Sequence, residues 1–312
     1  MNRTQFNKFL VPGLFSAAKE AYKPRSGEKE EWRQLVEAAG SVKTNSRRAY
    51  EESAYYAGLG NLVLKGEGEA ITYDEMVQGP TKRWTHKTWG LGTRITEEAI
   101  DDIIYPDIPT EVSQMNMELG SSAKETITLY VFDLWNSGNA TTTHTAGDGL
   151  AIFSNTHTLL RGGTWSNLLT PAADLSATTL QTSLDNFENQ KDDTGKYVRN
   201  RAKWLCVNPS NAWKAKELLN SAYDPESNSN AVNTLKSRNL QLFESPFFTD
   251  TDAYYLISDP VHSNAGTIFF MRRKVTFAKD GDFETGDAKF KVTARWSFET
   301  NRPTNLYASI GA

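Results

Sequence analysis

Apolar side chains recur every three or four residues between positions 108 and 136, which is the spacing of one face of an α-helix. They are Ile108, Val112, Met115, Leu119, Ala123, Ile127, Tyr130 and Leu134. Pro109 suits the first turn of a helix, and Asn136 with Gly138 suits its end. We therefore predict a helix of about 40 Å, at roughly 1.5 Å per residue, that is buried on one side and exposed on the other.

Residues 289–299 instead alternate between apolar and polar side chains, as a strand with one buried face does. Residues 267–278 are similar, and the turn-forming residues 279–282 separate the two segments, which predicts a long antiparallel hairpin. Between the long helix and this hairpin, helical and strand patterns alternate, which indicates a mixed α/β unit. Its predicted elements are helices over 176–190 and from Asn208 onward, and strands over 203–207, 240–246 and 253–258. A further helix is predicted over 29–39.

Residues 55–96 are polar and aromatic, with few aliphatic side chains. They predict strands over 70–73 and 83–89, with a turn at Gly79-Pro80 between them. A hairpin of this kind cannot build its own core, so we expect it to lie on another surface, either of the same chain or of a neighbouring subunit. The candidate contact residues are Arg83, Trp84, His86, Lys87 and Trp89. Basic residues interleaved with aromatic ones also suit single-stranded nucleic acid, and the pattern does not separate the two.

Charge is distributed unevenly along the chain, whose net charge is −4. Residues 1–50 contain ten Lys or Arg and five Asp or Glu, which gives +5 and leaves −9 for residues 51–312. A basic arm on an acidic body is typical of a segment that faces nucleic acid, although a solvated tail has the same composition. No apolar run is long enough to predict a membrane span. The single cysteine, Cys206, lies in an apolar run and is expected to be a buried, unreactive thiol.

The side chains that could bind a metal or catalyse a reaction do not form a recognised catalytic or metal-binding motif. His144, Asp148 and His157 lie in one polar loop, but their spacing fits no metal site of known pattern. The acidic turn that begins at Asp280 lacks the glycine at position six and the glutamate at position twelve that a calcium loop needs. We therefore expect no catalytic residues, no cofactor, no metal and no enzyme activity. A metal-dependent hydrolase built on the two histidines is kept as a remote alternative.

Three groups of motifs carry a resemblance to a known family. They are RRAYE (47–51) with GLG (58–60) and KGEGEAITYD (65–74), THKTWGLG (85–92) with ITEEAIDD (95–102), and DGLAIFSNTH (148–157) with GGTWSN (162–167). With these motifs, from residue 40 to 312, the chain resembles the major capsid proteins of tailed phages that have the Hong Kong 97 type of fold. The group it resembles most is the major head subunits of Mu-like prophages.

The resemblance implies an α+β capsid fold made of an N-arm, an extended E-loop hairpin, a peripheral domain and an axial domain. The peripheral domain would pack a long spine helix on a long antiparallel sheet, and the axial domain would be mixed α/β. The implied boundaries are 1–54 for the N-arm, 55–96 for the E-loop, 97–173 for the peripheral domain with its spine helix at 108–136, 174–262 for the axial domain, 263–300 for the returning peripheral sheet and 301–312 for the C-terminal segment.

The implied function is self-assembly into the hexamers and pentamers of an icosahedral shell around double-stranded DNA, in a virion assembled in the host cytoplasm. The implied partners are many copies of the chain, a portal, a separate scaffolding protein, a decoration protein in some shells, and DNA, with no membrane. Arg3, Lys8, Lys19, Lys23 and Arg25 would face the genome. Some family members cross-link through Lys and Asn; Lys65 lies in the right region, but no Asn can be assigned to it, so cross-linking is not predicted. An encapsulin-like cellular compartment on the same fold is the alternative.

Overall fold

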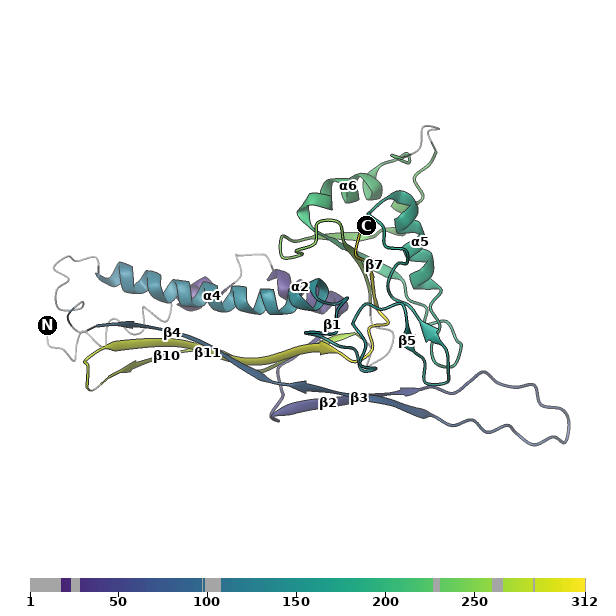
Figure 1. Cartoon of the computed structure of the whole chain (residues 1–312), viewed down its shortest axis with the longest axis horizontal. Helices are drawn as coiled ribbons and strands as arrows, with labels where there is room; N and C mark the ends of the chain where they lie inside the picture. The colour runs from purple at the N-terminus through teal and green to yellow at the C-terminus, as the bar shows by residue number, and fades with distance from the viewer. Residues whose placement is uncertain are drawn as a thin grey trace.

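A long four-stranded sheet runs along the longest axis of the molecule (Figure 1). The computed structural model describes residues 18–23, 29–96, 98, 108–226, 231–259, 266–282 and 284–311, and only the backbone of 108–113. The strand order is β1-β10-β11-β4, and the strands are Gly40–Lys43 (β1), Thr267–Gly281 (β10), Ala288–Thr300 (β11) and Lys87–Ile95 (β4). β10 and β11 form the predicted antiparallel hairpin, and β4 pairs antiparallel with β11. β1, which was not predicted, runs parallel to β10.

Two helices, α4 (Ile108–Asn136) and α2 (Glu31–Ala39), cover one face of this sheet. α4 confirms the predicted long helix, and Leu119 and Ala123 form a buried cluster with sheet residues Phe290 and Val292. α2 inserts Trp32, whose ring centroid lies 5.1 Å from that of Phe269. Each fully buried side chain of this size contributes about 1.5–3 kcal/mol through removal from water, so the helices and the sheet stabilise one another.

A second four-stranded sheet, with order β12-β9-β7-β8, forms the other unit of the chain. Its strands are Ala202–Val207 (β7), Gln241–Glu244 (β8), Tyr254–Ser258 (β9) and Leu306–Ser309 (β12), and its helices are Ala177–Glu188 (α5) and Pro209–Asn220 (α6). A capping box at Ser176 begins α5, while Asn208 caps α6 and Pro209 occupies its first turn. The predicted helices and strands of this unit are confirmed, and Cys206 is buried as expected. β12 was missed because its four residues are all buried and do not alternate.

The predicted strand at 70–73 and the predicted turn at Gly79-Pro80 are both wrong. The hairpin pairs β2 (Tyr50–Ala57) with β3 (Val77–Thr85), and residues 58–76 between them form a long loop without regular strands. Gly79 and Pro80 lie inside β3. They face the position in β2, between Ala54 and Tyr56, at which the pairing register shifts. Such a bulge tolerates a proline, which cannot donate a hydrogen bond. It also requires the glycine, because a Cβ at position 79 would lie 2.7 Å from the Tyr55 ring.

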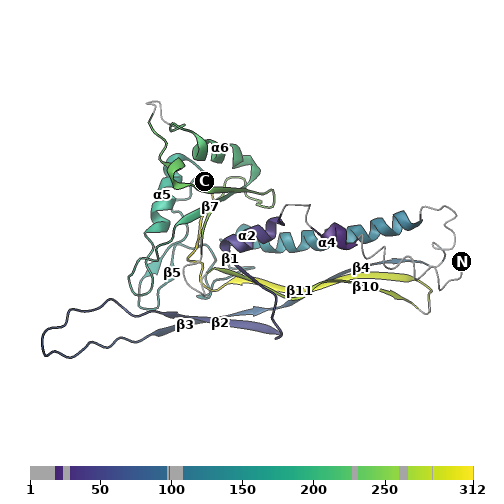
Figure 2. The same cartoon turned by 180° about the vertical axis from the view of Figure 1, so that it is seen from behind.

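The predicted extended segment at 83–89 is confirmed except at His86, where it divides between two sheets. β3 pairs with β2, whereas β4 belongs to the long sheet, so the same stretch of chain links the hairpin to the body. Both views show the loop extending well past the rest of the molecule (Figure 1 and Figure 2). The helix predicted after Thr96 falls outside the described residues.

Shorter elements complete the fold. A two-stranded ribbon joins β5 (His157–Thr158) to β6 (Thr164–Trp165), and a 3₁₀-helix, η1 (Leu235–Arg238), precedes β8. A helical segment at 18–22 approaches α4 so closely that a Cβ on Gly120 would lie 2.4 Å from the carbonyl oxygen of Ala18. In the described part of the chain, no helix is both long enough and apolar enough to cross a lipid bilayer.

Candidate functional site

Trp84, one of the predicted contact residues, is buried within its own chain. Its side chain is 1% exposed and meets the ring of Phe270 edge-on, with 5.8 Å between the centroids. Its indole Nε1 donates a hydrogen bond of 3.2 Å to the carbonyl oxygen of Glu299. Trp84 therefore fixes the hairpin to the long sheet of its own chain.

His86 and Trp89 are also occupied within the chain. The two ring nitrogens of His86 lie 2.8 Å from Ser46 Oγ and 2.9 Å from Ser297 Oγ. Trp89 stacks on Trp296, with ring centroids 5.5 Å apart. The surface that covers Trp84 and His86 thus belongs to the same chain, and Trp89 is half-buried there. The prediction that these three residues contact a neighbouring subunit stays a prediction.

Arg83 and Lys87 are the two predicted contact residues that remain exposed. Arg83 forms an ion pair of 2.7 Å with Glu52 and lies over the ring of Tyr50, 4.1 Å from its centroid. The ammonium group of Lys87 lies 6.0 Å from the ring centroid of Tyr130. Both cations are still able to meet a partner at their exposed faces.

Seven of the large apolar side chains that are exposed in the described chain lie instead on the loop 58–76. Leu62 is fully exposed, while Leu64 is 96% and Tyr73 is 91% exposed. The other large apolar side chains of the loop that are exposed are Leu59, Val63, Ile71 and Met76. Soluble monomers seldom expose so many apolar side chains together, so this loop has the character of a contact surface. The sequence signal was the run of three aliphatic residues at 62–64 inside a glycine-rich segment.

The loop is negatively charged, whereas the exposed face of the long sheet is positively charged. The loop 58–76 contains one lysine against four carboxylates, Glu67, Glu69, Asp74 and Glu75. Cross-strand pairs place cations on the sheet face opposite α4, with Asp280 at one end of that face. These cations are Arg273, Lys291 and Arg295, together with Arg94 and Lys289, which pair with Asp287 and Asp282 of the same chain. An acidic loop and a cationic sheet face on the same chain are complementary between copies.

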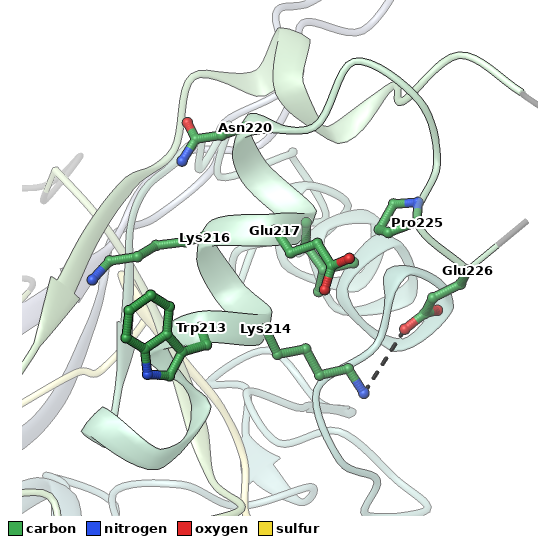
Figure 3. A pocket seen from close by; sticks show the side chains of 8 residues that line it. Trp213, Lys214, Lys216, Glu217, Asn220, Pro225 and Glu226 are labelled. Carbon is green, nitrogen blue, oxygen red and sulfur yellow. Dashed lines mark ion pairs between the residues drawn. The ribbon is translucent and has the colours of Figure 1, made fainter.

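A second exposed aromatic surface lies on α6, beside an open hollow (Figure 3). Trp213 is 79% exposed, and the ammonium group of Lys216 lies 5.5 Å from its ring centroid. Lys214 forms an ion pair of 3.8 Å with Glu226 across the hollow. Tryptophan is rarely left so exposed, because its large apolar surface is costly to keep in water. No periodic pattern in the sequence distinguishes this tryptophan from a buried one.

Two of the five predicted genome-facing residues are described. Lys19 and Lys23 are exposed at the segment that packs on α4 near Gly120. Arg3, Lys8 and Arg25 lie outside the described residues. The prediction that these five side chains face a genome stays a prediction.

The candidate metal residues are separated into two histidine–carboxylate pairs. His157 Nδ1 lies 2.7 Å from Asp148 Oδ2, and its ring stacks on Trp165. His144 Nε2 lies 3.1 Å from Asp133 Oδ2. In the described residues no group of three His, Cys, Asp or Glu side chains is placed to hold a metal ion. The two pairs hold loops in place through hydrogen bonds.

Two buried histidines make the folded subunit sensitive to mild acid. Burial lowers the pKa of His144 and, with help from Arg272 and Arg295, that of His86 below their ordinary value of 6.5. The unfolded chain therefore binds protons near pH 6.5 that the folded chain does not. Stability that is fully present above pH 6.5 falls as the pH drops below it, by at most about 1.4 kcal/mol per pH unit for each histidine.

Denaturant unfolding of the unassembled subunit between pH 7.5 and 5.5 measures this loss. The variant with His86→Asn and His144→Asn is expected to show a weaker dependence on pH across the same range, whatever its absolute stability. An unchanged slope in the double variant would mean that other groups set the acid sensitivity.

Comparison with known proteins agrees with the fold. A sequence model described as a phage capsid protein matches residues 79–309, which is well over half of the chain. The chain belongs to the phage capsid protein family. It is thus a major capsid shell protein, a structural component of the virion shell. Among curated proteins, none matches its sequence.

Solved capsids show that the fold is of the Hong Kong 97 type. The capsid of a native GTA particle has a TM-score of 0.58 at 11% identity, covering 93% of each chain. The capsid of cyanophage P-SCSP1u has a TM-score of 0.56 at 11% identity, covering 93% of this chain and 92% of that one. The capsid of bacteriophage JBD30, decorated with minor capsid protein trimers, has a TM-score of 0.52 at 15% identity, covering 68% and 90%.

Proposed function

We propose that this capsid protein assembles into the hexamers and pentamers of an icosahedral shell that encloses double-stranded DNA, and that assembly takes place in the host cytoplasm. The observation that carries the proposal is the loop 58–76, whose large apolar side chains are between 51% and 102% exposed in the described chain. Contact with another copy removes these side chains from water and gives assembly its driving force.

The surface that receives the loop is, in this proposal, the cationic face of the long sheet on a neighbouring copy. The four carboxylates of the loop complement the cations on that face, and complementary charge favours one docking register over others. Arg83 and Lys87, exposed near the junction of β3 and β4, would lie at the edge of the same contact.

The domain roles follow the resemblance, with two refinements. The N-arm is 1–54, the peripheral domain comprises 97–173 and 263–300, the axial domain is 174–262 and the C-terminal segment is 301–312. The pairing of β4 with β11 supports redrawing the E-loop from 55–96 to the hairpin 50–85, which ends the N-arm at residue 49, and counting β4 with the peripheral sheet. The pairing of β12 with β9 likewise supports counting the C-terminal segment with the axial domain.

Contacts around the centre of each capsomer would use the axial domain. A ring of identical subunits needs two different patches that fit each other on each copy. Trp213 on α6 supplies one such patch, because an exposed tryptophan beside paired charges is the kind of residue that dominates contact energy.

Other partners belong to the same proposal. Arg3, Lys8, Lys19, Lys23 and Arg25 would neutralise DNA phosphates without reading base sequence. A portal and a separate scaffolding protein would take part in assembly. The decorated JBD30 shell supports a decoration protein on the outside. Within the family, the motifs at 65–74 and 148–157 support a place in the Mu-like major head group.

Electron microscopy of the chain, expressed alone and together with the scaffolding protein of its phage, tests the proposal. The expected result is closed shells with hexameric and pentameric capsomers. Nuclease-protected double-stranded DNA is expected in particles from infected cells. A strictly monomeric product under both conditions would contradict the proposal, and an enzyme cargo in place of DNA would favour the encapsulin-like alternative.

A further inference from the structure

Arg161 contacts both ends of the exposed loop at once. Its guanidinium forms two hydrogen bonds to the Asp74 carboxylate, of 2.9 and 3.2 Å. The same group donates to the carbonyl oxygens of Gly58, at 3.2 Å, and Glu75, at 2.7 Å. One side chain thereby links the residue where the loop leaves β2 to the residues where it returns to β3.

Two more contacts complete this clamp. Asp74 Oδ2 accepts a hydrogen bond of 2.6 Å from the amide of Gly60, so the two ends of the loop are also joined directly. Lys196 donates from its ammonium group to the carbonyl oxygen of Leu59, at 2.7 Å. The loop 61–73 therefore begins from a root held by two cations.

The clamp is anchored in the body of the protein. Arg161 lies in the turn between β5 and β6, and the neighbouring amide of Leu160 donates a hydrogen bond of 2.8 Å to Asp193. Asp193 is 5% exposed and forms an ion pair with Arg302. A chain of contacts thus runs from a buried ion pair, through the turn, to the root of the loop.

Ordinary surface ion pairs contribute little, because water and salt screen them and two long side chains must be ordered. The Arg161 contact differs from an isolated pair in its geometry. A bidentate bond to a carboxylate fixes the plane of the guanidinium, and two further carbonyl acceptors fix its position. The hydrogen bonds from Arg161 lower the pKa of Asp74 to about 2, so the carboxylate is ionised at neutral pH.

We propose that Arg161 is a positioning residue, which holds the root of the loop 58–76 in one direction in the free subunit so that the loop is ready to dock on the neighbouring copy. The inference rests on the proposed function of the loop. Ordering the loop before contact lowers the entropic cost of assembly, and a fixed direction selects one angle between neighbours. The partner of the positioned loop is a second copy of this chain.

Hydrogen exchange in the unassembled subunit tests the clamp without requiring assembly. Arg161→Ala and Asp74→Ala are each expected to speed exchange at the Gly60 amide by roughly tenfold, because the acceptor of its hydrogen bond is released by the first change and lost in the second. The unfolding midpoint should stay within about 2 °C of the parent, since the clamp is a surface contact. Lys203→Ala removes another exposed ion pair, with Asp259, and serves as the matched control.

Assembly kinetics, followed by light scattering, then test the consequence. Arg161→Ala is expected to slow shell formation by about fivefold or more, while Lys203→Ala leaves it unchanged. Combining Arg161→Asp with Asp74→Arg should restore part of the rate. Unchanged exchange at Gly60 would overturn the clamp, and unchanged assembly with faster exchange would overturn its role in docking. If the parent chain forms no shell, the proposed function fails, whereas the exchange result still decides whether the clamp exists.

Discussion

Replacing Leu62, Leu64, Ile71 and Tyr73 by serine is expected to abolish shell formation while leaving the subunit folded. These side chains are between 67% and 102% exposed and therefore support no core of their own chain. We expect the unfolding midpoint to change by less than about 2 °C, because exposed positions away from special features tolerate substitution. Assembly should fall by more than about tenfold, because the apolar area buried between copies is lost. Light scattering and electron microscopy at matched protein concentration measure this outcome.

The control for this variant changes polar residues of the same loop. Asn61→Ser with Thr72→Ser alters the loop without removing apolar area, and we expect it to assemble like the parent. Normal shells from the four-serine variant would show that the loop is not the contact. In the same assay, Lys291→Glu on the cationic sheet face should slow assembly, which would locate the surface that receives the loop.

Trp84→Ala is expected to reduce the free energy of unfolding by about 3–5 kcal/mol, the range for truncation of a large aromatic side chain in a core. Trp84 is 1% exposed, packs on Phe270 and donates a hydrogen bond to the backbone of Glu299, so its loss leaves both a cavity and an unpaired acceptor. Denaturant unfolding of the unassembled subunit is the measurement.

Arg83→Ala, one residue away on the exposed face of β3, provides the comparison. It should change the free energy of unfolding by less than about 0.5 kcal/mol, because its ion pair with Glu52 is open to solvent. If the Trp84→Ala subunit has normal stability but fails to assemble, Trp84 contacts a neighbouring copy instead of supporting the core. The pair of variants therefore separates a core role from a contact role.

The parts of the fold that the sequence predicts are those with a local repeating pattern. Apolar side chains at helical spacing specify α4, and strict alternation specifies β10 and β11, because each element buries one face of its own. α5 and α6 were also predictable, since Ser176 and Asn208 mark where each begins. Neighbouring residues alone carry this information.

The parts that it did not predict depend on distant partners. β1 pairs with β10 across more than two hundred residues, and nothing within four residues of β1 indicates it. Gly79-Pro80 has the composition of a turn, yet a bulge opposite Tyr55 accommodates it within a strand. The division at His86 is set by which strand lies beside each half.

The candidate site shows the same limit. A run of aromatic and basic residues at 83–89 suggested the contact surface, but the chain uses most of those side chains to attach the hairpin to itself. The loop 58–76 and Trp213 stand out because few other residues cover them. Arg161 stands out because it binds Asp74, which lies far from it in the sequence. Such features have no periodic signature, so only the three-dimensional arrangement distinguishes them.

The passage of one chain segment from β3 into β4 has a mechanical consequence. β4 is paired with β11 at nine positions along its length, and the loop is joined to it by continuous backbone through β3. If the loop docks on a neighbouring copy as proposed, a force that separates the two subunits puts the loop under tension along the axis of β4. The β4–β11 ladder is then loaded in shear, so its hydrogen bonds must yield together instead of opening one after another. A shell joined in this way resists bursting through strand pairing inside each subunit as well as through the contacts between subunits.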